Sequence, residues 1–156
     1  MTTARPRRIS VIGAASCDAA TAAQARRLGA LLAGRGWEIV CGGGGGVMAA
    51  ACQGAREAGG RTIGILPGND PGAANPYVDV PIVTGMGIAR NVLVVLNGEA
   101  AVAVAGGAGT LSEIGLALKL GRPVAALGPY GGLPGVRAVA SPEEAAEAVA
   151  ALLDGS

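Results

Sequence analysis

Two glycine clusters, at residues 42–46 and 106–109, each lie between a short apolar run and a stretch with helical periodicity. A strand that leads through glycines into a helix is typical of a phosphate-binding turn, because bare backbone N–H groups and the positive helix end face the ligand. One turn of this kind is common and carries little information. Two of them in a chain of 156 residues indicate a fold that binds a small phosphate-bearing ligand.

Short β-rich runs alternate with helical patterns along the whole chain. The runs predict strands at residues 9–13, 38–41, 62–66, 80–83, 100–105 and 124–127. The helical patterns occupy residues 20–35, 47–58, 88–96, 111–120 and 142–153, and the stretches 67–76 and 130–135 are predicted loops. This alternation predicts an α/β fold, a doubly wound, Rossmann-like open parallel sheet with helices on both faces.

Residues 9–156 are predicted to form a single Rossmann-like domain, which is long enough to bury a substantial core. Residues 1–8 contain Arg5, Arg7 and Arg8 and are predicted to be a basic N-terminal tail. The chain has 51% hydrophobic residues but no Phe. Its core must therefore be built from Val, Ile, Leu and Ala, which suits helices packed closely on a buried parallel sheet.

Charge and reactive side chains exclude several classes of function. A net charge of +1 predicts no nucleic-acid partner, and the absence of His excludes a Ser-His-Asp triad and His-ligated zinc. No metal site is expected. The 3 cysteines form no CxxC pair, which indicates reduced thiols and a cytoplasmic protein. No apolar run approaches the roughly 20 residues of a membrane helix, so no membrane partner is expected.

The first glycine cluster lacks the features of well-known nucleotide-binding turns. A dinucleotide-binding GxGxxG motif should follow the first strand, but no such motif stands there, and neither cluster carries the Lys of a Walker loop. We interpret six residues as phosphate-binding, because ligands of open α/β sheets bind at the carboxyl ends of strands: Gly13, Ser16, Gly43, Gly44, Gly45 and Gly46. The alternative is that the glycines serve only the close packing of a strand against a helix.

The second cluster combines glycines that admit a ligand to the backbone with a hydroxyl: Gly106, Gly107, Gly109 and Thr110. Glu113 follows Thr110 on the same helical face. A capping box, with Thr110 as N-cap and Glu113 returning a hydrogen bond, explains the same spacing. Arg90 lies near the start of the otherwise apolar segment 88–96 and is expected to reach a phosphate, a carboxylate or a helix end. An ordinary surface arginine is the alternative.

Three stretches resemble one family when taken together: CGGGGGVMAAACQGAREAGG, GMGIARN and AGGAGTLSE. They are similar to the LOG-like (Lonely Guy) superfamily, whose members are often labelled lysine decarboxylases. The chain looks most like its short branch, which includes the molybdenum cofactor carrier proteins. The stretches at residues 62–91 and 109–124 resemble that branch most, and the similarity spans residues 9–127.

In cytokinin-activating Lonely Guy proteins, a PGGxGTxxE motif and an earlier Arg hydrolyse a nucleoside 5′-monophosphate to free base and ribose phosphate. The resemblance implies that Glu113 and Arg90 are the catalytic residues if this chain is such a hydrolase. Ala105 replaces the Pro of the motif, and Asn91 stands where Lonely Guy sequences usually carry Lys. Resemblance to the carrier proteins instead implies binding of the phosphate-bearing pterin of molybdenum cofactor. Arg90, Asn91 and Glu113 are then expected to be among the residues that bind the ligand.

The sequence therefore leaves more than one function open. The first is a binding protein for a phosphate-bearing, nucleotide-like ligand, such as a molybdenum cofactor carrier, with no required cofactor of its own. The alternatives are a nucleoside 5′-monophosphate phosphoribohydrolase and a sensing or scaffold subunit with a vestigial pocket. Lysine decarboxylation is not expected, since a pyridoxal enzyme needs a pocket lysine and Lys119 lies late in a predicted helix. The family also implies a homo-oligomer, either a dimer or a tetramer.

Overall fold

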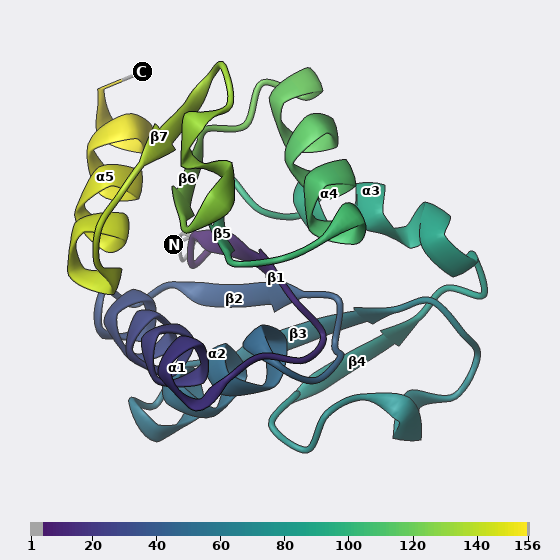
Figure 1. The fold of residues 1–156 in the computed structure, drawn as a ribbon. Coiled ribbons are helices and arrows are strands. Elements are labelled where there is room, and N and C mark those ends of the chain that lie inside the picture. Colours follow the sequence, from purple (N-terminus) through teal and green to yellow (C-terminus); the bar gives the residue numbers. More distant parts are fainter. Residues whose placement is uncertain (1–4, 156) are drawn as a thin grey trace.

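The computed structural model describes residues 5–155 as a seven-stranded sheet with helices on both faces (Figure 1). The strands lie in the order β4-β3-β2-β1-β5-β6-β7, and each pair of neighbours is parallel. The predicted doubly wound, Rossmann-like fold is confirmed. Because the strands are parallel, their carboxyl ends share one edge of the sheet, where ligands bind in this class of fold.

The strands are β1 Arg8–Gly13, β2 Glu38–Cys41, β3 Thr62–Leu66, β4 Val80–Val83, β5 Ala100–Val104, β6 Val124–Leu127 and β7 Val136–Ala138. The helices are α1 Ala19–Gly34, α2 Val47–Glu57, α3 Asn91–Leu96, α4 Ala108–Lys119 and α5 Pro142–Asp154. Short 3₁₀ turns are η1 Pro71–Ala73, η2 Gly87–Arg90 and η3 Pro129–Gly132. Within the described residues, none of the helices combines the length and the apolar character needed to span a membrane.

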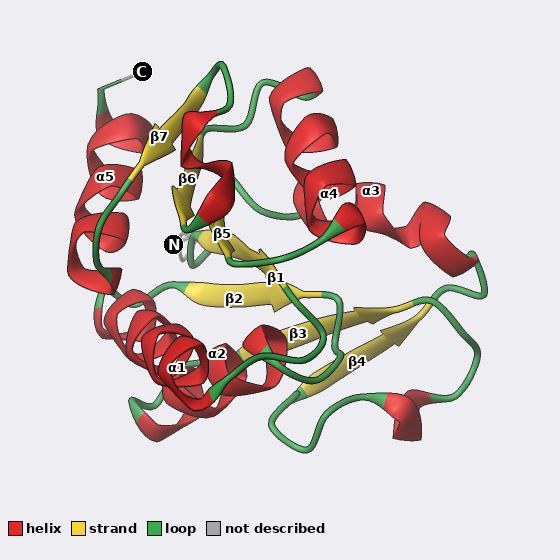
Figure 2. Ribbon diagram, viewed as in Figure 1, coloured by secondary structure: helices red, strands yellow, loops and turns green. Residues whose placement is uncertain are grey.

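The helices form two layers, one on each face of the sheet (Figure 2), and each layer encloses its own cluster of buried side chains. Helices α1, α2 and α5 cover one face, where Val11 and Leu28 are fully buried. Helices α3 and α4 cover the other, where Val94 and Ile114 pack on the sheet. Successive strand residues point to opposite faces, so Val11 and Ile12 belong to different layers. Both layers consist almost entirely of Val, Ile, Leu and Ala, as the composition predicts.

Several elements differ from the predicted boundaries. Helix α4 begins at Ala108 instead of Leu111, and the predicted helix at residues 88–96 divides into η2 and α3. The short edge strand β7 is not predicted by the sequence pattern. Strand β1 begins at Arg8, one residue inside the predicted tail, and Arg7 pairs with Glu99 and Asp154. Residues 1–4 of the predicted tail lie outside the described residues.

Helices α1 and α2 approach each other closely because each contributes a glycine to the contact. A Cβ built on Gly29 would lie 2.0 Å from the carbonyl oxygen of Ala51, and one on Gly54 would lie 1.9 Å from that of Arg26. Real Cβ atoms essentially never approach another heavy atom within 3.0 Å. A side chain at either position would therefore force the two helices apart.

We expect Gly54→Ala to lower the free energy of unfolding by about 1–3 kcal/mol, because the new methyl group overpacks a rigid backbone contact. Urea denaturation of the variant measures this loss. Gly34→Ala is the matched control, since a Cβ at this α1 position meets nothing within 4 Å. The control should raise stability by about 0.5–1 kcal/mol, because Ala is the better helix former. Equal effects of the two substitutions would contradict the close helix contact.

Candidate ligand-binding site

Strands β1 and β5 are neighbours at the centre of the sheet, although they are far apart in sequence. Gly13 at the end of β1 pairs with Val104 at the end of β5. The chain then leaves β1 towards α1 on one face and β5 towards α4 on the other (Figure 1). Open α/β sheets bind ligands in the crevice created where connections diverge in this way. This topology therefore places a candidate site beside Gly13.

A cavity of about 340 Å³ opens at this point. Its lining includes seven of the residues singled out from the sequence: Gly13, Arg90, Asn91, Gly107, Gly109, Thr110 and Glu113. The remaining five lining residues are all apolar: Ala14, Ala15, Met48, Pro67 and Ile88. The cavity thus combines a polar side, built by η2 and the start of α4, with an apolar side.

The amino terminus of α4 presents unpaired backbone donors to the cavity. Gly107 is the N-cap and makes no side-chain capping bond, and the first N–H to bond back within the helix is that of Leu111. The preceding N–H groups are therefore available to an anion, and the helix dipole makes this end positive. Thr110 lies inside the first turn, so the capping-box interpretation of Thr110 and Glu113 is wrong.

The turn before α4 has an unusual backbone. Ala105 has a φ of 53° and is the only non-glycine residue with a positive φ in the described part of the chain. Gly106 has a φ of 118°, and a Cβ there would lie 2.3 Å from the Oγ1 of Thr110. Residues held in sparsely populated backbone regions cluster at ligand sites. The strained backbone lowers local stability, but it directs the chain so that Gly107 lines the cavity.

A chain of polar contacts joins η2 and α3 to the first turn of α4. Arg90 Nη1 donates to Asn91 Oδ1 at 2.6 Å, and Asn91 Nδ2 donates to Ser112 Oγ at 3.2 Å. Ser112 Oγ in turn donates to the carbonyl oxygen of Gly109 at 2.7 Å. From the next loop, Tyr130 OH donates to the carbonyl oxygen of Gly107 at 2.9 Å. These bonds hold the polar side of the cavity in place.

Arg90 lies against the backbone of the first glycine cluster. A Cβ built on Gly42 would lie 2.8 Å from Arg90 Nη1, so a side chain at this position would displace the guanidinium from where it lies. The Nε of Arg90 is buried and has no hydrogen-bond partner among the described residues. An unpaired buried donor is costly and calls for a partner. Arg90 also lines the cavity, so its guanidinium offers a positive charge to an anion there.

Glu113 is a buried carboxyl group in the same cavity, with only 8% of its surface exposed. Burial raises the pKa of Glu113 to about 7, against a smaller lowering effect of the Arg90 charge. Its proton is therefore easily gained or lost near neutral pH. A carboxyl group whose pKa is strongly shifted and that lies in a cleft is typical of a functional site.

The glycines of the first cluster do not line the cavity, and Gly43 and Gly46 pack against or hydrogen-bond with neighbouring backbone and side chains. The Gly43 N–H donates to Cys41 Sγ, and its carbonyl oxygen accepts from the Asn75 N–H. A Cβ on Gly46 would lie 2.4 Å from the carbonyl oxygen of Ala14, so this glycine packs against the turn after β1. Neither these residues nor four others of the prediction line the cavity: Ser16, Gly44, Gly45 and Gly106.

Residues that the sequence did not single out complete the lining. Ala14 and Pro67 directly follow β1 and β3. Gly42, which does not line the cavity but lies against Arg90, directly follows β2. Because the ends of parallel strands share an edge, the residue after each strand was a usable signal. Met48 and Ile88 have no such signal, since only the tertiary arrangement brings them to the cavity.

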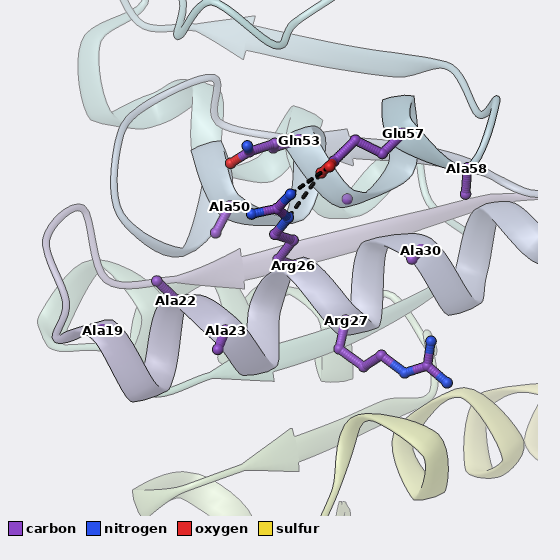
Figure 3. Close-up of a pocket in the computed structure, with 11 residues that line it drawn as sticks. Ala19, Ala22, Ala23, Arg26, Arg27, Ala30, Ala50, Gln53, Glu57 and Ala58 are labelled. Carbon is purple, nitrogen blue, oxygen red and sulfur yellow. Dashed lines mark hydrogen bonds and ion pairs between the residues drawn. The ribbon is translucent and has the colours of Figure 1, made fainter.

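A larger cavity of about 640 Å³ runs along α1 and α2, away from these strand ends. Figure 3 shows that Arg26 and Glu57 point towards each other across it, and Arg26 Nε donates to Glu57 Oε1 at 2.8 Å. Arg27 is paired with Glu143 of α5. The rest of the lining is mainly alanine. Its charges are satisfied within the protein, so the smaller cavity is the stronger candidate.

The chain matches the SLOG cluster4 family over residues 6–152. The molybdenum cofactor binding protein of Rippkaea orientalis has a TM-score of 0.90 and 37% identity, covering 97% of this chain and 99% of that one. The Moco carrier protein of Chlamydomonas reinhardtii has a TM-score of 0.85 and 39% identity, covering 97% and 99%.

A cytokinin riboside 5′-monophosphate phosphoribohydrolase of Mycobacterium tuberculosis is 34% identical over 123 residues. The match covers 73% of this chain and 66% of that protein. Together these matches confirm the predicted LOG-like, carrier-type resemblance, and the chain belongs to the SLOG cluster4 family.

Proposed function

We propose that this protein binds a phosphate-bearing, nucleotide-like ligand in the cavity at the carboxyl ends of β1 and β5, and that the ligand is molybdenum cofactor. One observation carries the proposal. The guanidinium of Arg90 shares the cavity with the uncapped amino terminus of α4, and together they offer positive charge and N–H donors to a phosphate.

The chemistry of the remaining lining fits such a ligand. Its apolar members, among them Met48, Pro67 and Ile88, suit the flat ring system of a pterin or a base. Two relatives that cover nearly the whole chain are a molybdenum cofactor binding protein and a Moco carrier protein, which supports a carrier function here. The ligand is cargo, so the protein requires no resident cofactor.

Binding is tested by titrating the protein with adenosine monophosphate and with molybdenum cofactor while following its thermal denaturation. A ligand that binds only the folded state must raise the melting temperature. Native mass spectrometry of freshly purified protein identifies any ligand that remains bound. If neither compound stabilises the protein and no bound mass is found, the pocket is vestigial and the proposal is wrong.

Arg90→Gln is expected to weaken binding of the phosphate-bearing ligand by about tenfold or more, because a charge-assisted hydrogen bond contributes about 1.5–3 kcal/mol. Calorimetric titration measures the loss. Arg122→Gln is the matched control, since the Nε of Arg122 is also buried without a partner in the described structure but lies outside the cavity. Equal losses in both variants would argue against a phosphate contact at Arg90.

A phosphoribohydrolase is the second candidate, favoured by the position of Glu113 in the cavity and by the mycobacterial relative. Cleavage of an N-glycosidic bond passes through a transition state like that of glycosidases, in which a nearby carboxylate stabilises the positive charge. Free adenine released from adenosine monophosphate, and lost in Glu113→Gln, would support this candidate. Binding without release would support the carrier.

The proposal includes self-association, as a dimer or a tetramer, in the cytoplasm. Apolar side chains are exposed along η2, α3 and α4, and Ile88, Leu96 and Leu111 expose 88%, 44% and 45% of their surface. Such a surface is typical of an interaction site. Light scattering after gel filtration tests the oligomeric state. The free thiols of the 3 cysteines support a reducing compartment.

A further inference from the structure

Two buried cysteines meet beside the candidate site without being part of it. Cys41 ends β2, Cys52 lies in α2, and their Sγ atoms are 3.6 Å apart. Neither residue exposes any surface, and neither lines the cavity. The third cysteine, Cys17, belongs to a different core cluster. The proposed function uses none of these thiols, so the contact between Cys41 and Cys52 needs its own explanation.

The surroundings of the pair distinguish the two thiols. The hydrogen bond with Cys52 lowers the pKa of Cys41 against the opposing effects of burial and of the Glu113 charge, and the Gly43 N–H and Arg90 act in the same lowering direction. The same hydrogen bond and burial raise the pKa of Cys52. Cys41 is thus the readier thiolate, and Cys52 is the neighbouring thiol.

We propose that Cys41 and Cys52 are an oxidation site at which a peroxide forms a reversible intramolecular disulfide. The Sγ atoms must approach from 3.6 Å to the roughly 2.05 Å of a disulfide, a movement of about 1.5 Å between β2 and α2. The connecting residues are the first glycine cluster, 42–46, and the first turn of α2. Glycines permit such a local adjustment more readily than other residues.

The reaction balances with hydrogen peroxide as the oxidant. The Cys41 thiolate attacks one peroxide oxygen, the O–O bond breaks, and a sulfenic acid forms while the leaving hydroxide takes up a proton to become water. The Cys52 sulfur then attacks the sulfenic sulfur, and a second water leaves with the Cys52 proton. Two thiols lose two electrons in total, and the peroxide gains them.

The bond would change the backbone on which the candidate site rests. The Gly43 N–H donates to Cys41 Sγ at 3.3 Å, and Gly42, the residue after Cys41, lies against Arg90. Oxidation turns the Cys41 sulfur, which accepts from the Gly43 N–H, into a disulfide sulfur, which is a weaker acceptor. Formation of the disulfide does not require a ligand, so this inference stands whether or not the proposed function holds.

The test uses the reduced, native full-length protein treated with hydrogen peroxide. We expect the intact mass to fall by two hydrogen atoms, a peptide map under non-reducing conditions to link Cys41 to Cys52, and dithiothreitol to restore the original mass. Cys17→Ser should give the same result. Cys52→Ser should instead gain oxygen at Cys41, because the sulfenic acid has no resolving thiol.

Three outcomes would overturn the inference. The first is that all thiols titrate as free, in denaturant, after peroxide treatment of the native protein. The second is a disulfide that includes Cys17. The third is a mass gain from added oxygen with no linked peptide in the wild type. Peptide mapping of the wild type keeps the test valid even if Cys52→Ser does not fold.

Discussion

Replacing Glu113 by glutamine is expected to raise the free energy of unfolding at pH 8 by up to about 3 kcal/mol. The glutamine keeps the shape of the side chain but cannot ionise. In the wild type, the buried carboxyl group is ionised at pH 8 in an environment that disfavours its charge. The substitution therefore removes a penalty that the folded protein otherwise bears.

The direction of the pH dependence follows from the pKa of Glu113. Burial raises this pKa from 4.5 to about 7, so the folded state holds its proton more tightly than the unfolded state. The resulting stability is fully present below pH 4.5 and is lost as the pH rises through about 7. Wild-type stability should fall across this window, and the stability of Glu113→Gln should fall less.

Urea denaturation at pH 5 and at pH 8 measures the effect. Glu147→Gln is the matched control, since Glu147 is an exposed glutamate of α5 and should leave the pH dependence as it is in the wild type. If Glu113→Gln and the wild type lose the same stability between the two pH values, Glu113 is not a buried, ionising group.

A carboxyl group kept at such a cost fits a site selected for ligand handling. Stability and function commonly conflict where a binding site needs a buried charge. In the proposed carrier, the protonated Glu113 can donate a hydrogen bond to an anionic ligand, whereas the ionised form repels it. Ligand affinity should consequently weaken in the same pH range in which the protein loses stability.

The fold was largely predictable because the sequence patterns that mark its strands and helices are short-range. Apolar runs such as residues 100–104 and glycines at the ends of helices mark the strands and connections directly. β7 escaped prediction because it is a three-residue edge strand containing Arg137, with no continuous apolar run. Its place in the sheet depends on the path of the loop after β6, and the spacing of residues in the sequence does not reveal that path.

The candidate site was predictable in its parts but not in its assembly. Spacing suggested Thr110 as a helix cap, whereas the helix begins at Ala108 because Gly107 serves as N-cap. Likewise, the pattern of five glycines could not show that Gly42, and not Gly43, contacts Arg90. Those details depend on where η2 packs, and η2 is placed by tertiary contacts.

Ala105→Pro, which would restore the proline of the Lonely Guy motif, is expected to lower the free energy of unfolding by about 3 kcal/mol or more. Proline fixes φ near –65°, roughly 120° away from the 53° that Ala105 adopts. It also removes the Ala105 N–H, which donates to the carbonyl oxygen of Leu127 at 3.0 Å. The turn would have to rebuild itself and displace Gly106 and Gly107.

Ala105→Gly separates the backbone requirement from the loss of the side chain. Glycine accepts a positive φ without strain, which relieves about 1 kcal/mol, but it makes the unfolded chain more flexible by a similar amount. Its stability should therefore stay within about 1 kcal/mol of the wild type, with the cavity intact. Urea denaturation and ligand titration of both variants check the pair. A proline variant as stable as the glycine variant, with unchanged affinity, would mean that Ala105 does not have a positive φ and that the path into α4 differs from the one described.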